Sequence, residues 1–431
     1  MSELLAQTPA DFARWLRSQG IRRAFVRLDD ATGKPVASHP ALAPLADFCA
    51  ADTRDFDRHE GVFLQVAPET GVLQAAFVHR TCRGQAAGGV RFWGYDTVEA
   101  FLRDGLRLAR GMTQKNALAG LWWGGGKGVM ARGTGSDLAR RRRIYEEYGA
   151  FVTSLRGLYV TAEDVGTHVD DMAAVFAHTR FTTCIPPALG GSGNPSVPTA
   201  RGVVRAIEAA LAHLGKGELS GKTVAVHGLG NVGGPLVRFL TERGVRRVIG
   251  CDLDARRLDD VRATCPDVEL ELHLGGHAET ALFSAEADVL APCATGGVLG
   301  PDTIGGLRAR VVCGAANNQL LDPERDDLAL SARGITYVPD FLANRMGIVT
   351  CADEGAGYDA GESIERHLGT EWEGAIYPLT RRVLEEAART GTTPHRVARA
   401  LADREAEALH PIFGHRGRGI LRAVVASGWA G

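Results

Sequence analysis

The period of hydrophobic and polar positions changes several times along this chain of 431 residues. Residues 9–20 have apolar side chains at helical spacing and end at a glycine, which predicts a short amphipathic helix. Residues 21–38 predict a strand, a turn at DDATGK and a second strand. This first unit, residues 1–58, is too short to predict a core of its own, so we expect it to pack on the main body.

Strands and helices alternate in the next part of the chain, residues 59–190. The segment 61–81 predicts a hairpin with ETG at its turn, and residues 97–120 have the apolar spacing of a helix. Residues 158–179 change from a strand to a loop and then to a helix. These features predict an α/β domain.

A loop rich in Gly, Pro and Ser, residues 186–202, is the clearest domain boundary. After it we predict a helix at 201–215, and then a strand, a Gly-rich turn, a helix and a strand from Thr223 onward. Short apolar strands follow at 287–292, 310–316 and 335–339. The pattern predicts a parallel α/β domain over residues 191–345 and a mostly helical segment over residues 346–431.

The Gly-rich turn has the setting of a dinucleotide fingerprint. It follows an apolar strand, opens a helix, and precedes a second strand that ends in Asp252, about twenty residues on. Asp252 would bond a ribose 2′-hydroxyl and repel a 2′-phosphate, which favours NAD over NADP, although Arg256 and Arg257 lie close in sequence. A doubly wound domain without a nucleotide is the alternative. The residues of the turn that we expect to hold the cofactor are Gly228, Gly230, Asn231, Val232 and Gly233.

Composition argues against several other classes of protein. The formal net charge of -2 gives no reason to expect nucleic acid, and the Arg140–Arg143 run fits a solvated helix face. No apolar run approaches the ~20 residues that span a bilayer, so we expect no membrane partner. The eight cysteines show neither CxxC pairs nor metal-ligand spacing, which predicts a cytoplasmic protein without a metal site.

Lysine is scarce in this chain, with five lysines against forty-four arginines, and two of the five lie in residues 111–128. Arginine stays charged at any working pH, whereas a lysine loses its proton more readily when it is desolvated or beside another cation. Lys115 and Lys127 are these two, and Asp164 follows the predicted strand LYVTAE. On these residues alone, Lys127 is either a general base or a solvated loop cation. Likewise, Asp164 is either a proton shuttle or a helix N-cap.

Seven segments follow one another along the chain: GGVRFWGYDTVEAFLRDGLRLARGMTQKNALAG, WGGGKG, YVTAEDVGT, SGNPSVPTARGV, HGLGNVG, APCATGGVL and GAANNQLLD. In this order they resemble the glutamate/leucine/phenylalanine/valine dehydrogenase family, and most closely its leucine dehydrogenase branch. The resemblance implies oxidative deamination of an L-amino acid to its 2-oxo acid and ammonia, with hydride transfer to NAD(P). It also implies a homo-oligomer.

The same resemblance implies a Rossmann-type doubly wound NAD domain and a separate α/β substrate (dimerisation) domain, to which residues 346–431 return. The N-terminal residues 1–58 would be a small addition.

The resemblance also implies roles for single residues. Lys127 would be the neutral amine that activates water, and Lys115 would bind the substrate carboxylate and lower the pKa of Lys127. Asp164 would accept the proton of the substrate ammonium group. Asn317, favoured over Asn318, would contact the nicotinamide side and the carboxylate. The substrate pocket would be lined by Ala87, Gly88, Gly89, Ala162, Ile348 and Cys351, and the cofactor cleft by Thr199, Cys293, Ala294 and Thr295.

Two departures from the leucine dehydrogenase pattern bear on specificity. Ala87 stands where that branch has Leu, which enlarges the pocket, and NRMGIV at 344–349 replaces NAGGV. We predict an apolar substrate side chain, branched or aromatic. Two alternatives stay open: a glutamate-type enzyme that uses Arg345, and a non-catalytic regulatory relative that binds NAD and an amino acid.

Overall fold

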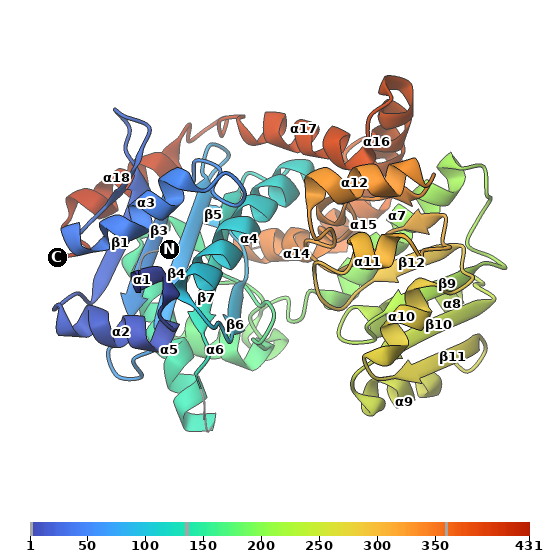
Figure 1. Cartoon of the computed structure of the whole chain (residues 1–431), viewed down its shortest axis with the longest axis horizontal. Coiled ribbons are helices and arrows are strands. Elements are labelled where there is room, and N and C mark those ends of the chain that lie inside the picture. The colour runs from blue at the N-terminus through green and yellow to red at the C-terminus, as the bar shows by residue number, and fades with distance from the viewer. Residues whose placement is uncertain (1–2, 134–137, 358–360) are drawn as a thin grey trace. The chain divides into compact units, whose positions relative to one another are not determined.

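A computed structural model of the chain describes residues 3–133, 138–357 and 361–431 (Figure 1). These residues form two compact units. Unit 1 comprises Met1–Asn194, Glu354–Tyr358 and Ala402–Gly431, and unit 2 comprises Pro195–Asp353 and Asp359–Leu401. The chain thus divides close to the boundary predicted from its Gly-, Pro- and Ser-rich loop.

Unit 1 is built on a mixed sheet with the strand order β2-β1-β3-β4-β7-β5-β8, in which β6 also pairs with β7. Strand β1 pairs antiparallel with β3, so the predicted N-terminal addition supplies two strands of the main sheet. Phe12 and Leu16 of the first long helix lie in the same hydrophobic core as that sheet. The strands are β1 (Arg23–Leu28), β2 (Pro35–Ala37), β3 (Gly61–Val66), β4 (Leu73–Arg80), β5 (Ala86–Ala87), β6 (Val90–Trp93), β7 (Gly124–Ala131) and β8 (Tyr159–Val160).

The longest helix of unit 1, α4 (Val98–Leu118), packs directly on this sheet. Its first turn is capped by the Thr97 hydroxyl, which accepts the Ala100 N–H at 3.1 Å. A Cβ at Gly105 would overlap the ring of Phe77 on β4, so a glycine is needed for this close approach. The other helices are α1 (Glu3–Ala6), α2 (Pro9–Ser18), η1 (Pro40–Leu42), α3 (Ala43–Ala51), α5 (Leu138–Ser154), α6 (Val169–Phe176), η2 (Pro187–Leu189) and α18 (Arg416–Ala426).

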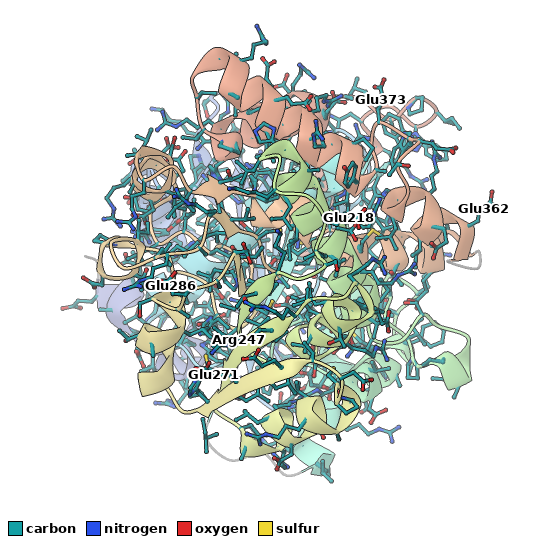
Figure 2. The ribbon with its side chains drawn as sticks, turned by 90° about the vertical axis from the view of Figure 1, so that its right-hand side faces the viewer. Glu218, Arg247, Glu271, Glu286, Glu362 and Glu373 are labelled. Carbon is teal, nitrogen blue, oxygen red and sulfur yellow. The ribbon has the colours of Figure 1, made fainter. Side chains whose placement is uncertain are left out.

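Unit 2 contains a parallel sheet with the strand order β11-β10-β9-β12-β13-β14. The order reverses between β9 and β12, which is the switch point where doubly wound sheets bind ligands. This arrangement confirms the predicted Rossmann-type fold class. Its strands are β9 (Thr223–His227), β10 (Arg247–Asp252), β11 (Glu269–Leu274), β12 (Val289–Pro292), β13 (Val311–Val312) and β14 (Thr336–Tyr337). At the β10–β11 edge, Arg247 forms an ion pair with Glu271 (Figure 2).

The first helix of unit 2, α7 (Ser196–His213), begins five residues earlier than the predicted start at 201. Pro198 lies in its first turn, where a proline costs no helical hydrogen bond, so the proline-containing loop already belongs to the helix. Helix α16 (Ile376–Thr390) packs on α7, which groups residues 359–401 with unit 2 by compactness. We predicted that residues 346–431 return to the substrate domain, whereas this division places residues 359–401 in unit 2.

The remaining helices that begin in unit 2 are α8 (Gly233–Glu242), α9 (Ala255–Thr264), α10 (His277–Phe283), α11 (Pro301–Ile304), α12 (Pro323–Ala332), α13 (Asp340–Ala343), α14 (Met346–Ala356), α15 (Gly361–Leu368) and α17 (Pro394–Ala406).

Candidate active site

Lys127 lies in the middle of strand β7 rather than in a loop, and its side chain is only 2% exposed. In the sheet, Lys127 lies opposite Phe77 of the antiparallel strand β4. The other edge of β7 pairs with β5 and β6. Burial removes the hydration of an ammonium group and so favours the neutral amine. The alternative of a solvated loop cation is therefore wrong.

The glycines beside Lys127 are required for close packing. A Cβ at Gly126 would come within 2.9 Å of Ala86, and a Cβ at Gly128 would overlap the hydroxyl of Tyr148. Side chains at these positions would push the neighbouring elements away from β7. The glycine run therefore lets the surrounding residues enclose the lysine amine.

Asp164 is the partner of this amine. Lys127 Nζ lies 2.9 Å from Asp164 Oδ2. The Thr167 hydroxyl fixes the loop after β8, because it accepts the Asp164 N–H and donates to the Asp164 carbonyl, both at 2.7 Å. The N-cap of α6 is His168, so the alternative that made Asp164 a helix N-cap is wrong. A Cβ at Gly89 would come within 2.8 Å of Asp164 Cβ, so a glycine at this position makes room for the aspartate.

A second cation, Arg91 on β6, contacts the same carboxylate. Arg91 Nε lies 3.3 Å from Asp164 Oδ2, and Arg91 Nη1 lies 3.1 Å from each carboxylate oxygen of Asp104 on α4. The Tyr95 hydroxyl donates to Asp104 Oδ2 at 2.6 Å. Asp164 is therefore held between Lys127 and an arginine that is itself anchored by Asp104 and Tyr95.

These contacts shift the ionisation of the cluster. Burial lowers the pKa of Lys127, Asp164 opposes this shift, Arg91 adds to it, and the net pKa is below the ordinary lysine value. Burial acts to raise the pKa of Asp164, but Lys127 and Arg91 together hold it well below its usual range. Burial, with Asp164 and Asp171 nearby, raises the pKa of Glu163 to about 7. A lysine with a depressed pKa beside a carboxylate is a common arrangement at catalytic sites.

The other predicted substrate residues of unit 1 lie on neighbouring elements. Ala87 on β5 and Ala162 after β8 are buried, at 1% and 5% exposure. The Gly88 carbonyl accepts the Tyr159 hydroxyl at 2.5 Å. Lys115 is half-buried near the end of α4. Its neighbour in sequence, Asn116, donates to the Gly124 carbonyl at 2.6 Å and so joins α4 to β7.

The Gly-rich loop of unit 2 has a backbone that fits a dinucleotide pyrophosphate. Gly228 has φ +89°, and a Cβ there would come within 2.6 Å of Ala294 Cβ. A Cβ at Gly233 would overlap the Gly228 carbonyl. Within the described part of the chain, no heavy atom lies within 4 Å of a Cβ placed at Gly230, so this backbone is open to a ligand. Helix α8 begins at Gly233, which directs its N-terminal N–H groups toward the loop.

Asp252 ends strand β10 beside this loop. Its Oδ2 accepts the Leu229 N–H at 2.8 Å, and its Oδ1 accepts the Asp254 N–H at 2.9 Å. A carboxylate has about four lone-pair positions, so these bonds leave acceptor capacity for a ribose hydroxyl. Arg257 Nη2 donates to Asn231 Oδ1 at 3.1 Å, which places one basic side chain at the loop.

The predicted cofactor-cleft residues of unit 2 lie at the beginning of helix α7 and in the loops after strands β12 and β13. Asn317 Oδ1 accepts the Asn344 side-chain amide at 2.9 Å, and Thr199 in the first turn of α7 donates to the Pro195 carbonyl at 2.8 Å. Burial raises the pKa of Cys293 to about 12, so its thiol stays protonated. Ala294 packs against Gly228, Thr295 is exposed, and Ile348 and Cys351 are buried on α14.

Arg345 is fully buried in unit 2, and its guanidinium donates to the carbonyl of Gly374 just before α16. Burial lowers the pKa of Arg345 to about 9. This backbone contact gives the arginine a structural role within unit 2. The predicted pocket residues Ala87 and Ala162 belong to unit 1, and Ile348 and Cys351 to unit 2, so their common pocket stays a prediction.

Comparison with known families and proteins shows which family the chain belongs to. The Glu/Leu/Phe/Val dehydrogenase dimerisation domain matches residues 64–181, and the Glutamate/Leucine/Phenylalanine/Valine dehydrogenase domain matches 190–255 and 257–402. The leucine dehydrogenase of Bacillus subtilis (strain 168) is 39% identical over 359 residues, which are 82% of this chain and 92% of that protein. The chain belongs to the Glu/Leu/Phe/Val dehydrogenase family.

Two further relatives are named for other amino acids, and a more distant structure shares the fold. The valine dehydrogenase of Streptomyces coelicolor is 40% identical over 354 residues, 81% of this chain and 91% of that protein. The L-tryptophan dehydrogenase structure from Nostoc punctiforme has a TM-score of 0.64 at 32% identity, covering 81% of this chain and 96% of its own. A hetero-hexameric glutamate dehydrogenase from Thermus thermophilus has a TM-score of 0.67 at 24% identity, covering 92% and 95%.

These matches confirm the predicted family, the two-domain α/β class and the enzyme class, a pyridine-nucleotide-dependent amino acid dehydrogenase. None of the described helices is both long and apolar enough to cross a membrane. The roles of single site residues stay predictions. The sequence prediction missed Arg91, Tyr95, Asp104 and Asn344. The first three lie in the segment 88–120 that carries the family resemblance, and Asn344 opens the segment NRMGIV.

Proposed function

We propose that this dehydrogenase catalyses the reversible NAD-dependent oxidative deamination of an apolar L-amino acid to its 2-oxo acid and ammonia. The observation that carries the proposal is the buried Lys127–Asp164 pair, with 2.9 Å between Nζ and Oδ2. A buried amine in contact with a carboxylate suits a reaction that moves protons between substrate, amine and carboxylate. Bound NAD would supply the acceptor for the hydride from the substrate Cα, and the residues that would hold it are those of the Gly228–Gly233 loop with Asp252.

Lys127 is the general base in this proposal. The substrate amine first loses a proton, the Cα hydrogen leaves as hydride, and the resulting iminium carbon accepts water. Neutral Lys127 takes a proton from that water, so a carbon–oxygen bond forms as the water oxygen–hydrogen bond breaks. Collapse of the adduct releases ammonia and the 2-oxo acid. The low pKa of Lys127 makes the neutral amine accessible at lower cost than for an exposed lysine.

Asp164 acts in two stages. While both cations touch it, its depressed pKa makes the carboxylate a weak proton acceptor, and its role is to position the Lys127 amine. Once Lys127 is neutral, one of the two adjacent positive charges is gone and the carboxylate becomes more basic. Asp164 then accepts the proton of the substrate ammonium group.

Arg91 and Asp104 set the balance of this cluster as positioning residues. Arg91 keeps a permanent positive charge 3.3 Å from Asp164, so it competes with the Lys127 ammonium for the same oxygen. This charge lowers the pKa of Lys127, whereas Asp104 raises it. The proposed role of Lys115, to bind the substrate α-carboxylate, is compatible with its half-buried place on α4.

The chemistry of the predicted pocket supports an apolar side chain. Ala87 and Ala162 are small and buried. A glutamate side chain would need a cation, and Arg345 is occupied by a backbone carbonyl within unit 2. None of the other three lysines is among the predicted pocket residues, so none is expected to bind a side-chain carboxylate. They are Lys34, Lys216 and Lys222.

We further propose that the enzyme is a cytoplasmic homo-oligomer. Among the described residues, no disulfide joins any of the eight cysteines, which suits a reducing compartment. One structural neighbour is described as a hetero-hexamer. Light scattering of the purified chain would test the assembly, and a monomer at micromolar concentration would contradict it.

A steady-state panel of leucine, valine, phenylalanine, tryptophan and glutamate, each with NAD and NADP, tests the proposed function. We expect the highest kcat/KM for one of the four apolar amino acids with NAD. A clear preference for glutamate would replace the apolar assignment with a glutamate-type specificity. Binding of NAD and an amino acid without turnover would show a non-catalytic relative.

A further inference from the structure

Three potential metal ligands from distant parts of the chain converge in unit 1: Glu60, Cys82 and His415. Glu60 precedes β3, Cys82 follows β4, and His415 is the N-cap residue of α18. Strands β3 and β4 are antiparallel neighbours, and the Glu60 N–H donates to the His79 carbonyl at 3.2 Å. One ligand atom from each of the three side chains lies within 4.8 Å of the others.

Backbone packing fixes the beginning of α18 against this corner of the sheet. The His410 N–H donates to the Cys82 carbonyl at 3.2 Å. A Cβ at Gly417 would overlap the side chain of Thr81, so the helix approaches this closely only with a glycine there. The position of His415 is thus set by the fold on both sides of it.

Thr81 orients the carboxylate of Glu60. Its N–H donates to Glu60 Oε1 at 2.8 Å, and its hydroxyl donates to Oε2 at 2.5 Å. His415 Nε2 lies 3.1 Å from the Thr81 hydroxyl oxygen and 3.6 Å from Glu60 Oε1. The side chains of His415 and Glu60 keep 23% and 15% exposure, so an ion can reach them from solvent.

We propose that Glu60, Cys82 and His415 bind a zinc ion, with water as the fourth ligand. Zn²⁺ uses thiolate, imidazole and carboxylate ligands at about 2.0–2.3 Å. Ligand atoms at those distances around a tetrahedral ion lie about 3.3–3.8 Å apart. The 3.6 Å between His415 and Glu60 falls in that range. The sulfur ligand argues against Mg²⁺ and Ca²⁺, which take oxygen ligands.

A divalent cation also suits the charges of the cluster. A coordinated thiol is deprotonated, so zinc binding would release its proton to solvent. The bound ion would then attract both the Cys82 thiolate and the Glu60 carboxylate.

The site would stabilise unit 1 rather than take part in the reaction. It joins α18 to the end of the β3–β4 pair, and Trp429, after α18, packs edge-on against Phe63 of β3 with ring centroids 5.4 Å apart. A structural ion here therefore adds to existing contacts between α18 and the sheet. A hydrogen-bonded cluster without an ion is the competing explanation, and it needs no thiol at position 82.

The test uses the full chain, purified with a chelator and kept reduced, and titrated with Zn²⁺ alone by calorimetry and with Co²⁺ by absorption. We expect one ion per chain, a thiolate-to-Co²⁺ charge-transfer band in the near ultraviolet, and a higher Tm with zinc. Cys82→Ser should abolish the band and weaken zinc binding by more than the roughly 10–100-fold that loss of an outer-shell partner costs, and His415→Gln should weaken it similarly. Cys265→Ser, which replaces a buried thiol in unit 2, is the control. It should change neither the charge-transfer band nor the zinc affinity.

Three outcomes would overturn the proposal: no stoichiometric zinc binding, Co²⁺ binding without the thiolate band, or unchanged affinity in Cys82→Ser. If Cys82→Ser fails to fold, the wild-type cobalt spectrum and the His415→Gln titration decide the question. The proposed zinc site shares no residue with the Lys127–Asp164 cluster. None of these outcomes therefore depends on the proposed reaction.

Discussion

The dinucleotide loop of unit 2 and the lysine–aspartate cluster of unit 1 differ in how their parts are distributed along the chain. Gly228, Gly230, Gly233 and Asp252 lie within one strand–helix–strand segment. Lys127, by contrast, meets a carboxylate from the loop after β8, and that carboxylate meets an arginine from β6. The first site is encoded locally, and the second exists only after the sheet has formed.

The two sites also work by different physical means. The glycine loop depends on backbone angle and free space, since Gly228 has φ +89° and Gly230 is open to a ligand. The unit 1 cluster depends on charge, since each pKa in it is set by burial and by the charges beside it. Substitutions that change shape should therefore damage the first site, and those that change charge should damage the second.

The largest effect is expected at Lys127. Lys127→Ala should lower kcat by about 10²–10⁴-fold, the contribution of a general base. Lys127→Arg should be nearly as damaging, because arginine keeps the charge but does not lose its proton. The measurement is NADH formation with the best amino acid of the panel, with NADH binding by fluorescence as the control for folding. Undiminished turnover in Lys127→Ala would contradict the mechanism.

A smaller effect is expected in the glycine loop, where shape decides. Gly230→Ala adds a methyl group in open space, so the fold should persist while affinity for NAD falls roughly tenfold, about 1.4 kcal/mol. Gly228→Ala should instead destabilise unit 2, since its φ is +89° and the added Cβ would meet Ala294 at 2.6 Å. Thermal unfolding and NADH titration separate the two outcomes. If both variants lost the same stability and the same NADH affinity, the two glycines would not serve the different roles assigned to them here.

A matched pair on α4 tests the packing that supports the unit 1 cluster. Gly105→Ala should cost about 1–3 kcal/mol of unfolding free energy because the methyl group overlaps Phe77. For Gly111→Ala, no heavy atom of the described residues lies within 4 Å of the added group, so it should stabilise by up to about 1 kcal/mol through helix propensity. Urea unfolding of both variants gives the values. Stabilisation by Gly105→Ala would show that α4 does not pack tightly on β4.

Much of unit 2 could be predicted from the sequence because its determinants are neighbours. The strand–glycine–helix pattern and the position of Asp252 fixed both the loop and the parallel sheet. The predicted start of α7 lies five residues after the observed start at Ser196. Pro198 favours a loop in the sequence pattern, although the first turn of a helix tolerates proline.

The electrostatic part of the unit 1 cluster could not be predicted in the same way. Lys127 and Asp164 were found through their motifs, but Arg91 contacts partners 13 and 73 residues away, and no local spacing indicates those contacts. The predicted like charge was Lys115, whereas a cation that lowers the pKa of Lys127 in the structure is Arg91. For the same reason, cysteine spacing gave no sign of the Glu60–Cys82–His415 cluster, whose residues come from distant parts of the chain.

The pH dependence of kcat/KM in Arg91→Gln and Asp104→Asn tests most directly whether charge balance poises Lys127. The reactive form is the neutral amine, so the rate rises with pH through the pKa of Lys127. Removing Arg91 removes a charge that lowers this pKa, so the acid limb should move to higher pH. Removing the Asp104 charge should move it to lower pH, and Arg91→Lys should lie near the wild type. Acid limbs that coincide in all four proteins, or that move together in one direction, would contradict the account.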